Sequence, residues 1–273
     1  MMNVPKLILM ALRVAGAAYV GMCLLVLIFQ ERYIYHPDRD VDLSRGARVT
    51  PEDVRLTTAD GERLGAWFVP ANPTNRLNLT LLFCHGNGGD IGNCIWSAET
   101  FHDLGFDVLV FDYRGFGAST GKPSEKGTYK DVDAAWDYLT AKRGIPPDRI
   151  VIFGRSLGGP IASELAARVN PRALVLESAF TSALDMGKKM FPFLPARLIC
   201  RYGYDTVAKV RKVTCPVLVA HSRTDGTVPF SMGVKVFEAA NNPKRFVEFR
   251  GGHNDGGMDS DESYRREFMR FLQ

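Results

Sequence analysis

The sequence predicts an α/β protein with a mostly parallel sheet, helices on both faces of that sheet, and one N-terminal transmembrane helix before it. Continuous apolar runs recur along the chain, as at 79–84, 107–111 and 150–153, and are typical of buried strands. Segments with helical spacing lie between such runs, notably at 124–143 and 157–169. Short apolar strands that alternate with amphipathic helices indicate a parallel sheet covered on both faces.

Composition places the chain among foldable globular proteins. It has 273 residues, of which 46% are hydrophobic and 23% charged, so neither a disordered nor a collagen-like chain fits. The net charge is only +4, which argues against nucleic-acid binding through a concentrated basic face. The five cysteines are scattered without a Cys-x-x-Cys pair or a zinc-type histidine spacing, so the sequence predicts no metal site and no disulfide framework.

Residues 1–30 predict an uncleaved, single-pass membrane anchor. Leu7 to Phe29 is an apolar run about as long as a helix needs to cross a bilayer, and Arg13 is its one charge. A cleaved signal peptide is the alternative, with residues 15–17 as the small-residue site, but a strong apolar run follows them. Lys6 and Arg13 lie before or early in the span, so the positive-inside rule predicts a cytoplasmic N-terminus and a main domain on the non-cytoplasmic side.

Residues 31–273 are predicted to form the main domain. Asp60-Gly61 lies between two strand-like segments and predicts a hairpin near the start of the sheet. Residues 183–212 interrupt the alternation of strands and helices, and they contain a stretch rich in phenylalanine and proline together with several basic residues. We interpret this segment as a short cap insertion over one end of the sheet.

Ser156 is the candidate nucleophile. It lies in Gly154-Arg155-Ser156-Leu157-Gly158, which fits G-x-S-x-G and stands directly between a strand-like run and a helix-like run. A serine on a sharp strand-to-helix turn needs small neighbours, and Gly154, Gly158 and Gly159 meet that need. The alternative is a glycine-rich turn with an incidental serine.

A serine hydroxyl needs a base, and His253 is the best candidate. His85, His221 and His253 all follow strand-like runs, and loops after parallel strands reach the same edge of a sheet. Only His253 lies C-terminal to a suitable acid, in the order nucleophile, acid, histidine that accompanies such a turn. That acid is Asp225, in the loop after the strand at 217–220, where a carboxylate can fix the imidazole tautomer.

Asp255 is the second candidate for the acid, but at two residues from His253 it is awkwardly placed to orient that ring. Backbone N–H groups of Leu157 and Asn87 are the candidate oxyanion hole. Leu157 follows the nucleophile, and Asn87 lies in the glycine-rich loop after the first parallel strand. A nucleotide-binding loop is the competing interpretation, but neither G-x-G-x-x-G nor G-K-[ST] fits that loop.

Taken together, these motifs resemble those of the alpha/beta-hydrolases. The similarity is greatest to the single-pass, membrane-anchored members of bacteria, fungi and animals, and it covers nearly the whole chain after the anchor. The motifs that carry it are residues 29–37, FCHGNGGDIGN, DYRGFGASTGKPSEKGTYKD, GRSLGG, ESAFTS and GGHND, in that order. The resemblance implies an alpha/beta-hydrolase fold and a Ser156–Asp225–His253 hydrolase with no metal or organic cofactor. One departure is Ser222, where relatives usually have glycine.

The function that we expect is a serine hydrolase that cleaves esters or thioesters near a membrane. The anchor and the Phe191-Phe193-Leu194 stretch favour a small-molecule or lipid-like acyl substrate, with ordinary core packing as the alternative explanation of that stretch. Members of the family that the chain resembles are often called esterases, lipases or depalmitoylating thioesterases, which implies the reaction type more than the substrate. The alternatives are a peptidase of the prolyl-oligopeptidase type and a non-catalytic anchored scaffold. We expect no propeller-sized N-terminal region in this chain, which argues against the peptidase. The sequence carries no signal for an oligomeric state.

Overall fold

The computed structural model describes residues 4–39 and 47–273, and it contains the α/β architecture that the sequence predicts. Its main sheet has eight strands in the order β10-β9-β8-β7-β4-β6-β3-β2, all parallel from β10 to β6, with β3 antiparallel to both β6 and β2. The strands are β2 (Glu52–Thr57), β3 (Arg63–Val69), β4 (Thr80–Cys84), β6 (Asp107–Phe111), β7 (Ile150–Arg155), β8 (Ala173–Glu177), β9 (Val217–His221) and β10 (Lys244–Glu248).

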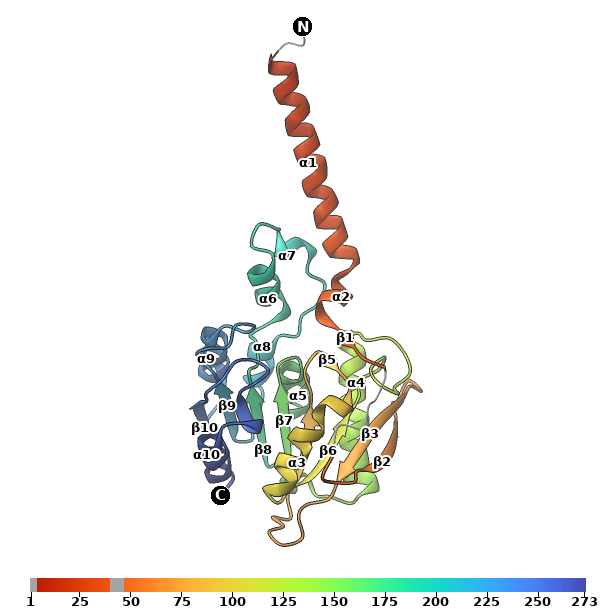
Figure 1. Cartoon of the computed structure of the whole chain (residues 1–273), viewed down its shortest axis with the longest axis vertical. Helices are drawn as coiled ribbons and strands as arrows, with labels where there is room; N and C mark the ends of the chain where they lie inside the picture. The colour runs from red at the N-terminus through yellow and green to blue at the C-terminus, as the bar shows by residue number, and fades with distance from the viewer. Residues whose placement is uncertain (1–3, 40–46) are drawn as a thin grey trace.

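Helices cover both faces of this sheet (Figure 1). One face packs against α4 (Glu125–Asp137), α5 (Gly158–Ala166), α8 (Thr206–Val210) and α9 (Phe230–Ala239). The other face packs against α3 (Ile95–Asp103) and α10 (Glu262–Leu272). Short helical turns occupy Ile91–Cys94, Tyr138–Lys142, Pro147–Arg149 and Gly257–Asp259.

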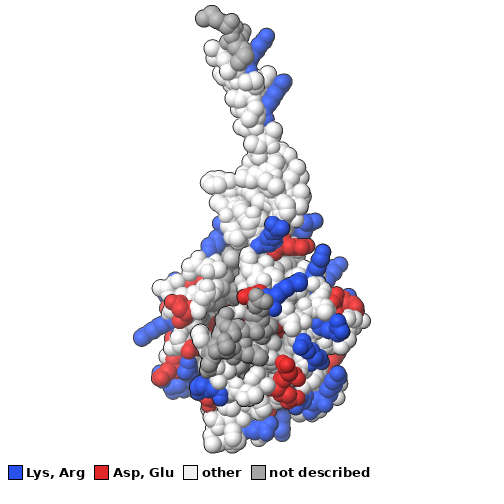
Figure 2. Space-filling model, turned by 45° about the vertical axis from the view of Figure 1, so that its right-hand side comes forward, with Lys and Arg blue, Asp and Glu red and all other residues white. Residues whose placement is uncertain are grey.

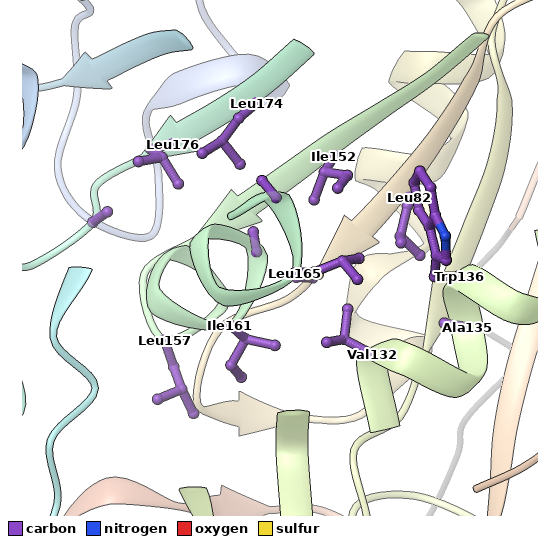
Figure 3. Close-up of a cluster of buried hydrophobic side chains, with 14 of the residues drawn as sticks. Leu82, Val132, Ala135, Trp136, Ile152, Leu157, Ile161, Leu165, Leu174 and Leu176 are labelled. Carbon is purple, nitrogen blue, oxygen red and sulfur yellow. The ribbon is translucent and has the colours of Figure 1, made fainter. Parts of the chain in front are cut away.

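The apolar strands feed two cores because successive side chains of a strand point to opposite faces. In β4, Leu82 belongs to the core under α4 and α5, whereas Leu81 and Phe83 belong to the core under α3 and α10. Figure 3 shows the first core, where Leu82 and other strand residues face Leu165 of α5 and Trp136 of α4. Strands that are buried on both faces explain why the runs in the sequence are continuously apolar rather than alternating.

The N-terminal helix α1 (Val4–Ile28) extends away from the domain (Figure 1) and is almost entirely exposed. At 25 residues it is about 37 Å long, which exceeds the roughly 30 Å of a bilayer's hydrocarbon. By length and composition it is able to cross a membrane, a property that signal sequences share. After Phe29 the chain turns into α2 (Gln30–Ile34) and then into β1 (His36–Pro37), which pairs with β5 (Gly88–Gly89).

The segment between β8 and β9, where the sequence predicts the insertion at 183–212, has two parts. Its helices α6 (Ala183–Met190) and α7 (Ala196–Ile199) extend from the sheet toward α1, and α7 contacts α1 (Figure 1). The following helix α8 packs against α5 and α9 instead, with Val210 buried in the core. We call residues 183–201 the cap.

Candidate active site

Ser156 stands on a sharp turn between β7 and α5. Its φ is +53°, in the left-handed region that costs a residue with a side chain about 1–2 kcal/mol. The turn fits only because its neighbours are glycines: a Cβ on Gly158 would lie 1.9 Å from the carbonyl oxygen of Cys84, and one on Gly154 would lie 2.5 Å from the carbonyl oxygen of Gly158. The backbone N–H of Ser156 donates to the carbonyl of Glu177 at 2.9 Å and anchors the turn to the end of β8.

His253 and Asp225 reach this turn from the loops after β10 and β9. The distance from His253 Nε2 to Ser156 Oγ is 3.0 Å, and that from His253 Nδ1 to Asp225 Oδ2 is 2.8 Å. The structure therefore brings the three side chains chosen from the sequence into one hydrogen-bonded row. In such a row, a proton on Nδ1 faces the carboxylate and leaves Nε2 able to accept the hydroxyl proton.

The environment of Asp225 keeps its carboxylate charged. Burial acts to raise the pKa of Asp225, but hydrogen bonds from His253 and from the backbone amides of Val228 and Thr227 outweigh burial and hold the pKa below its ordinary value. Those amides donate to Oδ1 at 2.7 and 2.9 Å and leave Oδ2 for His253. Asp255, the second candidate, accepts from the Gly252 amide at 2.6 Å and serves the loop rather than the imidazole.

The other two strand-end histidines are buried, and the hydrogen bonds of their rings go to groups other than Ser156. His221 lies behind the acid, with Nε2 3.5 Å from Asp225 Oδ2 and 3.0 Å from the Val228 carbonyl, and burial lowers its pKa. His85 packs at a tilt against Tyr113 with a ring-centroid distance of 4.4 Å, and burial lowers its pKa to about 4. Both rings are therefore neutral at neutral pH, and neither competes with His253.

Asn87 and Leu157, the candidate oxyanion-hole residues, line the same cavity as Ser156. The loop of Asn87 passes close to the nucleophile, since a Cβ on Gly86 would lie 3.8 Å from Ser156 Cβ. The pairing of β1 with β5 fixes this loop, and the His36 amide donates to the Asn87 carbonyl at 2.8 Å. The connector that follows the N-terminal helix thus supports the loop beside the nucleophile.

A mostly apolar cavity of about 300 Å³ extends from Ser156 to the end of α1. One side is a face of α6, where Ala183, Met186, Gly187 and Met190 recur at helical spacing. The opposite side includes Val26 of α1 together with α2. The cavity therefore joins the candidate nucleophile to the apolar N-terminal helix.

Comparison with known proteins identifies the family. A family model described as the alpha/beta hydrolase fold matches residues 80–198. The alpha/beta hydrolase domain-containing protein WAV2 of Arabidopsis thaliana is 36% identical, over 94% of this chain and 92% of that protein. An uncharacterized protein of Mycobacterium tuberculosis is 38% identical, over 86% of this chain and 84% of that protein.

The chain belongs to the alpha/beta-hydrolase superfamily, as the sequence motifs predict. Among solved structures, a Pyrococcus furiosus esterase superimposes with a TM-score of 0.68 at 20% identity, covering 88% of this chain and 97% of that one. At this level of identity, the likeness supports the alpha/beta-hydrolase fold. The strand order and the mostly parallel sheet agree with it.

Two sets of interactions that hold this hydrolase site together are not predicted by the sequence. The hydroxyls of Ser222 and Thr224 both donate to the Gly251 carbonyl, at 2.5 and 2.8 Å, and tie the loop of Asp225 to the loop of His253. A glycine at position 222 would lack this hydroxyl, so Ser222 adds a hydrogen bond between the two loops. A serine beside a strand-end histidine was the only signal for it.

The second set of interactions is a partly buried ionic network below the nucleophile. Arg155 donates to Glu177 at 2.5 Å and to Asp259 at 2.8 Å, and the Glu177 carboxylate also accepts from the Met258 amide at 2.9 Å. This network ties the two strands beside Ser156 to the segment just after His253. Charged residues at the ends of apolar strands were its only trace in the sequence.

Proposed function

We propose that this chain is a serine hydrolase that cleaves carboxylic esters or thioesters of lipid-like acyl groups at a membrane. The observation that supports the chemistry best is the position of His253, which lies within hydrogen-bond reach of Ser156 on one side and Asp225 on the other. An isolated serine hydroxyl is a weak nucleophile, and this row supplies its base.

In the first half of the reaction, Ser156 Oγ attacks the acyl carbon while His253 Nε2 takes the hydroxyl proton. Asp225 stabilises the imidazolium that forms. The backbone N–H groups of Leu157 and Asn87 stabilise the oxyanion of the tetrahedral intermediate. The intermediate collapses, the bond to the alcohol or thiol breaks, and His253 returns its proton to that leaving group, so that an acyl-enzyme remains.

In the second half, water attacks the acyl carbon and gives a proton to His253. The second tetrahedral intermediate expels Ser156 Oγ, which recovers the proton from the imidazole, and the carboxylic acid leaves. The residues of the site suffice for both halves without a metal or organic cofactor in this scheme.

The apolar cavity favours acyl chains over peptides. Its walls carry methionine, phenylalanine and other apolar side chains. Each methylene group that an acyl chain buries against them contributes about 0.8 kcal/mol of binding free energy. The N-terminal helix favours a membrane location, with residues 1–30 as a single-pass anchor and 31–273 as the hydrolase domain. In this proposal the positive-inside rule places the domain on the non-cytoplasmic side.

The test is labelling of the full chain with a fluorophosphonate, which phosphonylates an activated serine. We expect labelling of the wild type and none of Ser156→Ala, with His253→Gln strongly reduced. A panel of esters, thioesters and peptide amides on the wild type then identifies the bond that is cleaved. Equal labelling of wild type and Ser156→Ala would refute the nucleophile, and turnover of amides alone would favour the peptidase.

A further inference from the structure

The cap carries apolar side chains on two opposite sides. Phe191 and Ile199 line the cavity that leads to Ser156. Phe193 and Leu198 do not line it and are 86% and 84% exposed, more than any other large apolar side chain in the described residues. A short segment that is apolar on its outer side needs a non-aqueous neighbour to cover that side.

The tip of the cap lies beside α1, while these two side chains stay exposed. The Tyr19 hydroxyl donates to the Phe193 carbonyl at 3.0 Å, which places the tip of the cap nine residues before the end of α1 at Ile28. Nine residues correspond to about 13 Å along a helix axis. Figure 1 shows the cap standing beside the domain-proximal half of α1.

Hydrogen bonds hold the base of the cap against the junction of α1 and α2. Gln30 Nε2 donates to the Ile199 carbonyl at 2.7 Å, and the Arg201 amide donates to Gln30 Oε1 at 2.9 Å. Arg201 Nη2 also donates to the Leu27 carbonyl at 2.8 Å. The cap and the end of α1 therefore form one body, and whatever surrounds this part of α1 also surrounds the tip of the cap.

The cap is also rich in basic side chains. Lys189 donates to the carbonyls of Gly226 and Thr227, and Arg201 donates to that of Leu27, so both of these cations lie away from the tip; the one cap acid, Asp185, is paired with Lys188 at 3.0 Å. Figure 2 shows an uncharged collar around the stem with Lys and Arg side chains below it. An apolar tip with Lys and Arg side chains below it is typical of a segment that inserts its tip among acyl chains while its cations stay near lipid phosphates. The basic residues concerned are Lys188, Lys189, Arg197 and Arg201.

We infer that the cap tip, Phe193 and Leu198, inserts into the same membrane leaflet as the end of α1, and that acyl chains pass from this leaflet directly into the cavity above Ser156. The dimensions agree. A helix of 25 residues exceeds the hydrocarbon thickness by about 7 Å; with that excess on the domain side, Phe193, about 13 Å from the end of α1, reaches about 6 Å into the hydrocarbon. Segments that lie in a membrane interface are buried by about 5–10 Å.

The inference rests on the proposed function for the bond cleaved and adds the source of the substrate. Val26 lines the cavity and lies near the end of α1, so the cavity reaches the level of the membrane surface. An acyl group held in the bilayer then reaches the nucleophile without crossing water. The substrate class is therefore a long-chain acyl ester or thioester that resides in the leaflet, rather than one that arrives dissolved.

The activity test uses the full chain in vesicles of phosphatidylcholine and phosphatidylglycerol, with the double variant Phe193→Ser, Leu198→Ser. Leu77→Ser is the matched control, because Leu77 is also exposed but precedes the amino end of β4, at the edge of the sheet opposite Ser156. We expect hydrolysis of a vesicle-bound palmitoyl ester to fall at least about tenfold in the double variant and to be unchanged in the control. Hydrolysis of a dissolved butyryl ester and fluorophosphonate labelling should be retained in both.

The outcomes separate the two proposals. If the wild type neither takes the label nor cleaves either ester, the proposed function fails. If the double variant takes the label and cleaves the vesicle-bound palmitoyl ester at the wild-type rate, the hydrolase stands and the insertion is refuted.

A second measurement does not depend on the folding of the double variant. In vesicles with brominated acyl chains, the fluorescence of the tryptophan introduced by Phe193→Trp should be quenched, and that of the tryptophan introduced by Leu77→Trp should not. An unquenched Phe193→Trp, as expected if a second copy of the chain covers the tip, would overturn the inference.

Discussion

Gly187 offers a direct test of whether the cavity binds the acyl chain. It lies inside α6, on the face whose other members Ala183, Met186 and Met190 also line the cavity. Apart from its chain neighbours and the backbone of its own helix, a Cβ built on Gly187 has no atom within 4 Å. A side chain introduced there therefore enters the cavity without a clash at its first carbon.

Phenylalanine at this position should shorten the chain that the site accepts. In a cavity of about 300 Å³, we expect the benzyl group of Gly187→Phe to displace about four methylenes of a bound acyl chain. At about 0.8 kcal/mol for each buried methylene, the loss is about 3 kcal/mol, or about 200-fold in kcat/KM for a palmitoyl ester. An acetyl or butyryl ester, which stays near Ser156, should change less than about threefold.

Stability should not confound this result. Removing a glycine from a helix interior stabilises the folded state by about 0.5–1 kcal/mol, and this offsets the cost of an apolar side chain in a cavity. Gly187→Ala is the matched control, with the gain in helix propensity but little added volume. The assay is kcat/KM for nitrophenyl esters from two to sixteen carbons in detergent micelles. A decline that is uniform across all chain lengths, or no decline at all, would refute the assignment of the acyl site.

Three further predictions concern the machinery around Ser156. Asp225→Asn should lower kcat by on the order of 10⁴-fold, because the amide no longer fixes the imidazole tautomer, whereas Asp255→Asn should remain within a few-fold; equal losses would reject Asp225 as the acid. Gly158→Ala should destabilise the fold by about 3 kcal/mol or more in urea unfolding, since its Cβ would meet the Cys84 carbonyl at 1.9 Å, and a wild-type midpoint would contradict that packing. Asp112→Asn should remove a pH dependence of stability. Burial raises the pKa of Asp112 to about 8, so between its unfolded pKa and about 8 the folded state holds a proton that the unfolded state has lost. The stability contributed by that proton is fully present below about pH 4 and disappears as the pH rises through 8, so the free energy of unfolding of wild type relative to Asp112→Asn should fall by up to about 1.4 kcal/mol per pH unit over that window. Parallel pH profiles would show that the carboxyl is already ionised.

The parts of this fold that the sequence predicted are those that a local pattern determines. A strand buried on both faces must be apolar at every position, so β4, β6 and β7 were visible as runs. The turn at Ser156 was visible because its backbone leaves no room for a Cβ at Gly154 or Gly158. Parallel strands also end at one edge, so the order of the loops was enough to select His253 and Asp225 as neighbours of the serine.

The remaining features depend on contacts between distant segments, for which no local pattern exists. Arg155 and Asp259 are far apart in the sequence, and only the packing of the loop after β10 brings them together. The sequence also predicts a cap that is too long, 183–212 instead of 183–201, for the same reason. Both α6 and α8 contain apolar residues, and only the packing shows that α8 contacts α5 whereas α6 faces the cavity. Helix ends also differ from those predicted. The helical pattern runs over 124–143, but α4 ends at Asp137 and the chain continues to Lys142 as a short π-helix.

In the proposed membrane-anchored hydrolase, the arrangement of α1 links attachment to chemistry in a way that two separate modules would not. If α1 served only as a tether, its junction with the domain would be an exposed linker with few contacts. Gln30 is instead buried and hydrogen-bonded to the cap, and Val26 contributes to the cavity wall. The connector then pairs with the loop that holds Asn87. Because these contacts run from the helix through the cap to the loop beside Ser156, we propose that the orientation of an inserted α1 also sets the direction from which the acyl carbon approaches the nucleophile.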